Sequence, residues 1–241
     1  MKKTRKKLFE DYFDSIFSHS NVFSKGEYEN SFLQFDLNYG NFMPRQKEAR
    51  ILDVGCGTGH FLYYLAKKGY DNYLGIDLSP QQVDFCRKNV SGQVKMADAF
   101  EFLKAQKNMY DVIIANDLLE HIPKEEVVNF LKLVHRGLIN EGCFLMKTPN
   151  LGNPFAVYLR YKDFTHEAGL SDKSLYQVLW MAGCRDIQIL PYKTYFNSTI
   201  KHFIEFKSVQ VIWFIMTKLF QIQGFTAPKI LTPLLLGAAR K

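Results

Sequence analysis

The sequence predicts a doubly wound α/β domain, in which a mostly parallel sheet carries helices on both faces. Three observations predict it. Short apolar segments alternate with helical patterns between residues 50 and 147, a glycine cluster follows the first apolar segment, and residues 112–115 are continuously apolar. Such alternation is typical of βα units that build a parallel sheet. The chain of 241 residues has room for one such domain with an appended element.

Seven strands are predicted within this pattern, and the last of them is expected to run antiparallel to the others. They span residues 51–54, 73–77, 94–98, 111–115, 143–146, 187–190 and 234–238. The segment at 111–115 is rich in β-branched residues, which favours a strand that is buried on both faces of the sheet.

Two of the predicted helices carry clear start signals. Ser79 is placed to cap a helix whose first turn holds Pro80, and Gln82 at the third helical position would complete a capping box. Pro123 is expected to open a helix whose apolar residues recur at helical spacing as far as Leu138.

Beyond residue 147 the pattern changes. Residues 148–170 form a loop-like segment with many aromatic and polar side chains, and Ser171 is expected to begin a short helix. Residues 198–223 predict a long, strongly apolar helix. We therefore expect a basic arm and helical lead-in at residues 1–49, followed by one domain at residues 50–241.

The formal charge of +7 is concentrated at the N-terminus. Five of the 31 basic residues lie within the first seven positions, so the remaining chain holds 26 basic residues against 24 acidic ones. A basic arm can contact a phosphate-rich partner or an anionic membrane surface, or it can be a solvated terminus. Because the rest of the chain is close to neutral, nucleic acid is not expected as a partner.

Four widely spaced cysteines without a C-x-x-C pair predict a reduced protein that has neither a disulfide framework nor a zinc site. The sequence shows no metal-ligand spacing, so no metal is expected in the mechanism. No uncharged apolar segment reaches the roughly 20 residues that span a bilayer, and acidic residues interrupt the N-terminal apolar stretch. We expect a cytoplasmic location, with peripheral contact with the inner membrane as an alternative.

A glycine-rich segment after the first predicted strand is the clearest candidate binding site. Residues 53–59 read Asp-Val-Gly-Cys-Gly-Thr-Gly, and glycines let a backbone turn sharply and approach a ligand closely. Asp77 follows Gly55 by 22 residues, where a carboxylate can accept hydrogen bonds from the hydroxyls of a ribose. The third glycine comes one residue earlier than in the G-x-G-x-x-G pattern of dinucleotide sites, which disfavours a nicotinamide or flavin cofactor.

Four segments resemble, in chain order, the motifs of the class I methyltransferases. Residues 51–59 resemble the first motif, 75–79 the second, 97–99 the third and 111–121 the fourth. The resemblance covers about residues 50–149. It implies a Rossmann-like methyltransferase sheet with S-adenosyl-L-methionine as the cofactor, and a Rossmann-like domain without a cofactor is the alternative.

The same resemblance assigns roles within the cofactor site. Asp77 would hold the ribose, Asp98 and Ala99 would flank the adenine, and Asn116 would lie beside the methionine part. The complete set of predicted cofactor-binding residues is Asp53, Gly55, Cys56, Gly57, Gly59, Asp77, Leu78, Asp98, Ala99 and Asn116.

Methyl transfer to a hydroxyl group also needs a group that removes the proton. The candidates are His121 after the fourth strand and three ionisable residues of the loop at 148–170, namely Asp163, His166 and Glu167. We expect His166 to be the general base and Asp163 to orient it. The alternatives are a structural histidine at position 121 and a solvated turn around residues 161–167.

The methyl acceptor is less well defined by the sequence. The segments Thr148-Pro149-Asn150 and 163–167, with the helix that ends at Ala182-Gly183, resemble a bacterial methyltransferase subgroup linked to surface-polysaccharide biosynthesis, although Cys184 replaces the usual aromatic residue. This resemblance implies O-methylation of a sugar or glycan hydroxyl. Aromatic rings in the loop could stack on sugar faces while imidazole and carboxylate groups bind hydroxyls.

Three alternatives remain open. The apolar helix at residues 198–223 could place the protein at a membrane surface, next to an isoprenoid or other lipid-linked acceptor. It could instead pack on the sheet or form a homodimer contact. A methyltransferase fold could also serve as a non-catalytic binding subunit, in which case neither the cofactor nor its demethylated product would bind.

Overall fold

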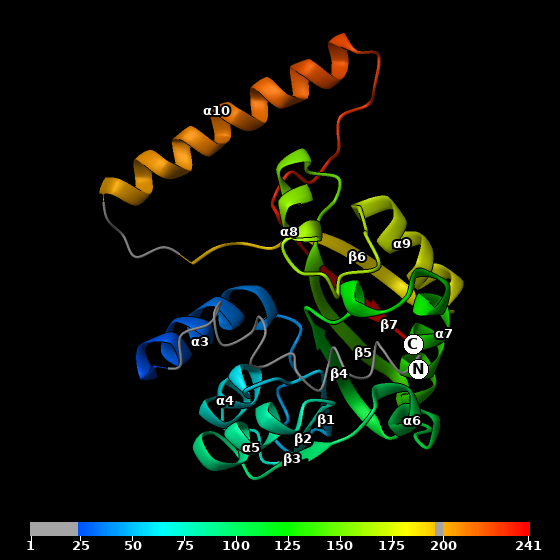
Figure 1. The fold of residues 1–241 in the computed structure, drawn as a ribbon. Coiled ribbons are helices and arrows are strands. Elements are labelled where there is room, and N and C mark those ends of the chain that lie inside the picture. The colour runs from blue at the N-terminus through cyan, green and yellow to red at the C-terminus, as the bar shows by residue number, and fades with distance from the viewer. Residues whose placement is uncertain (1–23, 196–199) are drawn as a thin grey trace.

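The computed structural model describes residues 24–195 and 200–241, and these form a sheet flanked by helices (Figure 1). The basic arm predicted at the N-terminus and the first two residues of the predicted apolar helix lie outside these ranges. The strands are β1 (Ile51–Val54), β2 (Tyr73–Asp77), β3 (Val94–Met96), β4 (Tyr110–Asn116), β5 (Leu138–Pro149), β6 (Arg185–Pro191) and β7 (Leu234–Arg240). The α-helices are α3 (Lys25–Tyr39), α4 (His60–Lys67), α5 (Pro80–Asn89), α6 (Ala99–Lys104), α7 (Val127–Gly137), α8 (Val157–Tyr161), α9 (Asp172–Met181) and α10 (Ile200–Ile222).

The sheet has the strand order β3-β2-β1-β4-β5-β7-β6. β1 pairs in parallel with β2 and β4, and β5 pairs in parallel with β4, whereas β7 is antiparallel to both β5 and β6. The predicted α/β fold, mostly parallel with an antiparallel last strand, is therefore confirmed. β7 is inserted between β5 and β6, a position that the linear order of the strands did not indicate.

Helices cover both faces of the sheet, and successive strand residues alternate between two cores. On β4, Ile113 packs on the side of α6, α7 and α9, and Ile114 packs on the side of α3, α4 and α5. On β5, Phe144 and Leu145 divide in the same way. This period of two is the geometry of a strand, and burial on both faces explains why the central strands are continuously apolar.

The helix after β2 begins at Ser79 as predicted, but only half of the predicted capping box forms. The Ser79 hydroxyl accepts a hydrogen bond from the Gln82 amide at 3.4 Å. The Ser79 amide donates to Asp77 Oδ1 at 2.8 Å instead of to the Gln82 side chain. Gln82 lies against the loop after β1, because a Cβ on Gly57 would come within 2.7 Å of its Oε1. A full capping box forms instead at Ser171, which begins α9 as predicted and pairs with Ser174.

Three predicted boundaries are wrong by a few residues. Pro123 does not start an α-helix directly, because a 3-10 turn at η3 (Lys124–Glu126) precedes α7. Leu138, predicted as helical, is the first residue of β5. The third strand ends at Met96 rather than at Asp98, because the Asp98 carboxylate caps α6 by accepting from the amides of Phe100 and Glu101.

The apolar helix α10 stands away from the sheet (Figure 1). More than half of the surface of Val211, Phe214 and Ile215 is exposed. Of the alternatives that the sequence left open for this helix, the structure does not show packing on the sheet, and the exposed apolar side chains need another explanation. Among the described residues, no helix combines the length and the apolar character that crossing a bilayer requires.

The lead-in before the sheet supplies α3, which packs on α4 through aromatic rings. Phe35 meets Phe61 edge-to-face with the ring centroids 5.0 Å apart, and Tyr39 meets Phe61 at 5.6 Å. Edge-to-face pairs of this kind add about 0.5–1.5 kcal/mol each beyond their buried area. Tyr28 of the same helix donates to the Thr58 carbonyl at 3.0 Å. The first helix of the described chain is thus fixed to the loop after β1.

Gly59 tests how tightly this loop is packed. It adopts a φ of +89°, and a Cβ there would lie 2.5 Å from Cys86 Sγ, whereas Gly69 adopts a φ of +78° with nothing within 4 Å. We expect Gly69→Ala to lower the free energy of unfolding by about 1–2 kcal/mol, the cost of a left-handed residue. Gly59→Ala is expected to cost at least about 1 kcal/mol more, because overpacking adds to this strain.

Urea unfolding of both glycine variants measures the two costs. In the Cys86→Ala background, Gly59→Ala should lower the free energy of unfolding by less than it does in the wild type. The clash with the sulfur atom is then absent, and only the backbone strain remains. Equal losses for the two single variants would contradict the close packing of Gly59.

Candidate active site

The strand order reverses between β1 and β4, and a cavity of about 2350 Å³ lies beyond the carboxyl ends of these strands. Open α/β sheets bind their ligands at such a switch point. Pockets for one small ligand are usually about 300–1,000 Å³, so this cavity has room for two ligands side by side. Its wall contains the glycine loop, the segment after β4 and the loop at residues 158–167.

Asp77 joins the glycine loop to the start of α5. Its Oδ2 accepts from the Gly57 amide at 2.9 Å, and its Oδ1 accepts from the Ser79 amide at 2.8 Å. Burial raises the pKa of Asp77, and the hydrogen bonds from the Ser79 and Gly57 amides counteract this rise. Each oxygen keeps a further lone pair, so the same carboxylate can also accept from a bound ribose.

Asp53 lies deeper, at the end of β1. It is 2% exposed and contributes to the cavity wall. Burial, together with the negative charge of Asp77, raises the pKa of Asp53 to about 8. The pair therefore favours a positive ligand in the cavity, because a cation would reduce the cost of holding both carboxylates charged.

Asn116 is held by the lead-in helix. Tyr39 of α3 donates its hydroxyl hydrogen to Asn116 Oδ1. Asn116 Nδ2 is buried, and no residue in the described part of the chain accepts a hydrogen bond from it. Because a buried donor without a partner is costly, this amide is set to donate to a ligand in the cavity.

The other predicted cofactor residues divide into those that face the cavity and one that does not. Gly55, Cys56, Gly57, Leu78, Asp98 and Ala99 contribute to its wall. Gly59 lies outside the cavity wall and packs on Cys86 and Val90 of the α5 region. Asp98 uses one carboxylate oxygen to cap α6, with bonds of 2.9 and 3.1 Å.

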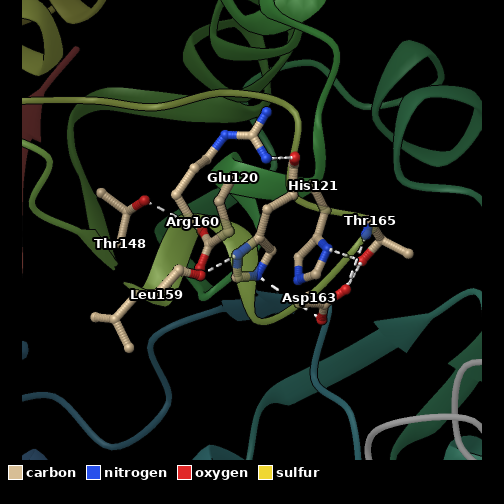
Figure 2. A network of polar contacts seen from close by, with 8 residues as sticks. Glu120, His121, Thr148, Leu159, Arg160, Asp163 and Thr165 are labelled. Atoms are coloured by element: carbon tan, nitrogen blue, oxygen red, sulfur yellow. Dashed lines mark hydrogen bonds and ion pairs between the residues drawn. The ribbon is translucent and has the colours of Figure 1, made fainter. Parts of the chain in front are cut away.

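The predicted catalytic residues form a buried network at the other end of the cavity (Figure 2). His121 comes from η2 (Leu119–His121), and Asp163, Thr165 and His166 come from the loop after α8. His121 Nδ1 lies 2.8 Å from the Thr165 hydroxyl, which donates to Asp163 Oδ1 at 2.6 Å. The rings of His121 and His166 meet edge-to-face at 4.7 Å.

The role expected for Asp163 needs a correction. Asp163 lies near His166, but its Oδ2 is 3.8 Å from His166 Nε2, which is longer than a hydrogen bond. The Leu159 carbonyl accepts from His166 Nδ1 at 2.7 Å and orients the ring. Asp163 instead orients His121 through Thr165. Glu167, the remaining candidate base, is exposed, although its backbone amide donates to the Glu120 carbonyl at 2.6 Å.

Burial favours the neutral form of both histidines. Burial and the neighbouring His166 lower the pKa of His121 to about 4, and burial lowers the pKa of His166. Arg160 holds the loop from the opposite side by donating to the carbonyls of His166 and Glu167. The imidazoles are therefore held in place before any ligand binds, which favours catalysis.

Three charged residues of the site were not among the predicted catalytic groups. Glu120 is 3% exposed, and burial raises its pKa to about 8. Lys147 pairs with Asp117 at 2.6 Å, and although burial opposes it, the Asp117 carboxylate raises the pKa of Lys147. Asp117 has a φ of +50°, which is rare outside glycine and is found at functional sites. The sequence signal that could have revealed the Lys147–Asp117 pair is a lysine within the largely buried strand β5.

Comparisons with known proteins agree with this geometry. Residues 51–142 match the family model described as a methyltransferase domain. The chain is 28% identical over 183 residues to phosphoethanolamine N-methyltransferase 3 of Arabidopsis thaliana, which covers 71% of the chain and 36% of that protein. It is 27% identical over 212 residues to carboxy-S-adenosyl-L-methionine synthase of Nautilia profundicola, which covers 83% of the chain and 85% of that protein.

The solved structures show the same fold. A crystal structure of an S-adenosylmethionine-dependent methyltransferase from Archaeoglobus fulgidus superposes with a TM-score of 0.66 at 23% identity, covering 98% of this chain and 99% of that chain. By contrast, this chain spans little more than a third of the length of the first plant relatives. The region that matches the family model includes the glycine loop and strand β1.

The buried Asp53 carboxyl predicts a pH dependence of stability. Its pKa in the folded protein, about 8, is above the ordinary value of 3.8. A carboxyl with a raised pKa favours folding most below its unfolded pKa, and this contribution is lost as the pH rises toward about 8. One pKa unit corresponds to about 1.4 kcal/mol. As the pH rises from 5 to 8, the free energy of unfolding of Asp53→Asn should therefore increase by at least about 1 kcal/mol relative to that of the wild type.

Urea unfolding at pH 5, 6, 7 and 8 measures this difference. Asp84→Asn, a change of an exposed carboxylate on α5, is the matched control and should show little change with pH relative to the wild type. A constant difference between Asp53→Asn and the wild type over this range would contradict the raised pKa.

Proposed function

Since residues 51–142 match a methyltransferase-domain model, we propose that this chain uses S-adenosyl-L-methionine to methylate a hydroxyl group of a sugar or glycan. The acceptor is of the kind found in bacterial surface polysaccharides. The observation that carries the proposal is the pair of neutral, buried imidazoles, His121 and His166, in the wall of the cavity that also contains the glycine loop. A hydroxyl acceptor needs such groups because it must lose a proton.

The cofactor has defined partners in the cavity. The Asp77 carboxylate has lone pairs for the ribose hydroxyls, and the unpaired Asn116 Nδ2 has a hydrogen for the carboxylate of the methionine part. Asp53 and Asp77 favour the positive charge of the sulfonium cofactor. These contacts position the methyl group, and positioning alone can supply up to roughly 7–11 kcal/mol of the barrier in ideally oriented reactions.

The acceptor would bind between the glycine loop and the histidines. Tyr158 and Phe164 line the same cavity with 72% and 88% of their surfaces exposed, so their rings are available to stack on a sugar face. The acceptor hydroxyl loses its proton at the histidine cluster. With the cofactor bound, the acceptor oxygen would form a bond to the methyl carbon as the carbon–sulfur bond breaks, with S-adenosylhomocysteine as the second product.

His166→Ala tests the role assigned to the histidines. We expect the turnover of labelled methyl groups to fall by about 100-fold or more, while the affinity for S-adenosyl-L-methionine stays within about twofold because the ring lies outside the predicted cofactor contacts. His135→Ala, which removes a half-buried histidine of α7 outside this cavity, is the control. Unchanged turnover in His166→Ala would remove this residue from the mechanism.

The acceptor panel for this assay distinguishes the alternatives. Nucleotide sugars and glycans are expected to be methylated, with lipid-linked sugars and phosphoethanolamine as competing candidates. Methylation of phosphoethanolamine alone would replace the sugar acceptor with an amine, in line with the named activity of the plant relatives. If calorimetry found no binding of S-adenosyl-L-methionine or S-adenosylhomocysteine, a non-catalytic binding subunit would be the better explanation.

The exposed helix α10 favours a second candidate, in which the acceptor is carried by a lipid. Val211, Phe214 and Ile215 are exposed and recur at helical spacing, so they form one apolar face of this helix. Such a surface can lie in the headgroup region of a membrane, and the lysines and arginine of the N-terminal arm would add attraction to anionic lipids.

Sedimentation with vesicles that contain phosphatidylglycerol tests this candidate. We expect the wild type to sediment and the double variant Phe214→Ser with Ile215→Ser to remain largely in solution. Trp180→Ser, which changes an exposed aromatic residue on α9, should sediment as the wild type does. A wild type that stays in solution and elutes as a dimer would assign the apolar surface to a homodimer contact instead.

A further inference from the structure

Glu120, His121 and His166 meet in the cavity wall, although His166 follows His121 by 45 positions in the chain. One ligand atom from each side chain lies within 4.8 Å of those of the other two. A carboxylate with two imidazoles is a common ligand set for divalent transition metals. We propose that these three side chains bind a divalent transition-metal ion such as Zn²⁺.

The hydrogen bonds around His121 place its lone pair at the correct nitrogen. The Thr165 hydroxyl donates its hydrogen to Asp163 Oδ1 at 2.6 Å. Thr165 Oγ1 therefore acts as the acceptor toward His121 Nδ1, which lies 2.8 Å away and carries the ring hydrogen. In this tautomer the lone pair of His121 is on Nε2, the atom that would bind the ion.

His166 is fixed in the same tautomer by a different partner. Its Nδ1 lies 2.7 Å from the Leu159 carbonyl, which can only accept a hydrogen bond. Nδ1 therefore carries the hydrogen and Nε2 carries the lone pair. Histidines that bind metals almost always donate their other ring N–H to a carbonyl, a carboxylate or a similar acceptor. Both histidines of this cluster meet that condition.

Glu120 has the arrangement expected of a carboxylate ligand. The Thr148 hydroxyl donates to Glu120 Oε2 at 3.1 Å, which orients the side chain and leaves Oε1 for an ion. The Glu120 backbone is fixed as well, because its carbonyl accepts from the amides of Glu167 and Ala168 at 2.6 and 3.1 Å. These two bonds tie the loop that carries His166 to the turn that carries Glu120.

The ligands reach one site from two segments of the chain. Glu120 and His121 are adjacent in η2, and His166 follows after β5 and α8. Sequence spacing could not reveal this set, which is why no metal was expected from the sequence. Three protein ligands leave a coordination position open in catalytic sites of this type, and all three line the cavity.

The open position has a consequence that rests on the proposed function. An ion there would bind the oxygen of the acceptor hydroxyl and lower its pKa. The imidazoles would then hold the ion, and the proton of the acceptor hydroxyl would pass to water in the cavity. Without an ion, His166 would be the base, as expected from the sequence.

Titration with Co²⁺ tests the site directly. The full-length protein, purified without a histidine tag and treated with a chelator, is expected to bind one equivalent of Co²⁺ with visible absorption bands of a nitrogen- and oxygen-bound ion. Calorimetry with Zn²⁺ should give the same stoichiometry. Glu120→Gln and His166→Ala are expected to weaken binding at least 100-fold. Thr148→Val, which removes only the group that orients Glu120, should weaken it about 10-fold.

The controls separate a built site from general effects. His135→Ala should bind Co²⁺ within twofold of the wild type, and the affinity of each variant for S-adenosyl-L-methionine shows that its domain is folded. The proposal is overturned if the wild type shows no saturable binding up to about 1 mM, or if Glu120→Gln and His166→Ala bind as the wild type does.

These measurements do not depend on the acceptor. Absent metal binding with intact methyl transfer would overturn the metal site and leave the proposed function standing. Metal binding without methyl transfer to any sugar would overturn the proposed function and leave the metal site standing. Methyl transfer that persists at the full rate in the chelated protein would show that an ion bound at this site takes no part in turnover.

Discussion

The hydrogen bonds of the Asp77 carboxylate are the constraint on which the cofactor end of the site depends. One oxygen accepts from the glycine loop after β1 and the other accepts from the start of α5, so two chain reversals are held by one side chain. The loop can then approach a ligand closely, and the helix begins at a fixed place. The lead-in helix closes the same loop from outside, through the contact between Tyr28 and the Thr58 carbonyl. Without these bonds the glycines that shape the loop would also leave it free to move.

Buried acids dominate the electrostatics of the cavity. Asp53, Asp77 and Glu120 all have raised pKa values because burial disfavours their charged forms. Lys147 compensates Asp117, but within the described residues no lysine or arginine forms an ion pair with these three. Buried carboxyl groups without an ion-pair partner lower the stability of the folded protein. Groups of this kind concentrate at functional sites. A sulfonium cofactor at one end and a metal ion at the other would each supply positive charge.

The sheet of the protein resembles that of known methyltransferases, whereas the loop at residues 158–167 lies outside the segment that matches the family model. The sheet, the glycine loop and the strands around it are shared with a wide range of methyltransferases. The segment at residues 158–167 lines the cavity together with His121, and the named relatives differ in their reactions. One fold can serve many reactions, so the choice of acceptor depends on the side chains of the site rather than on the sheet. The rigid attachment of the loop by Arg160 and by the Glu120 carbonyl favours a single, defined acceptor pose.

The sequence by itself determined the strands, their mostly parallel arrangement and the position of the glycine loop, because these follow from local patterns: apolar period, glycine spacing and an acid at a strand end. It also selected Asp77 and Asn116, which are the last residues of β2 and β4. Only the tertiary structure decided that β7 lies between β5 and β6 and that α10 leaves the sheet, because strand insertion and helix docking depend on contacts between distant segments. The cluster of Glu120, His121 and His166 is of the same kind. Backbone hydrogen bonds between two loops bring its members together, and the spacing of these residues along the chain does not indicate that contact.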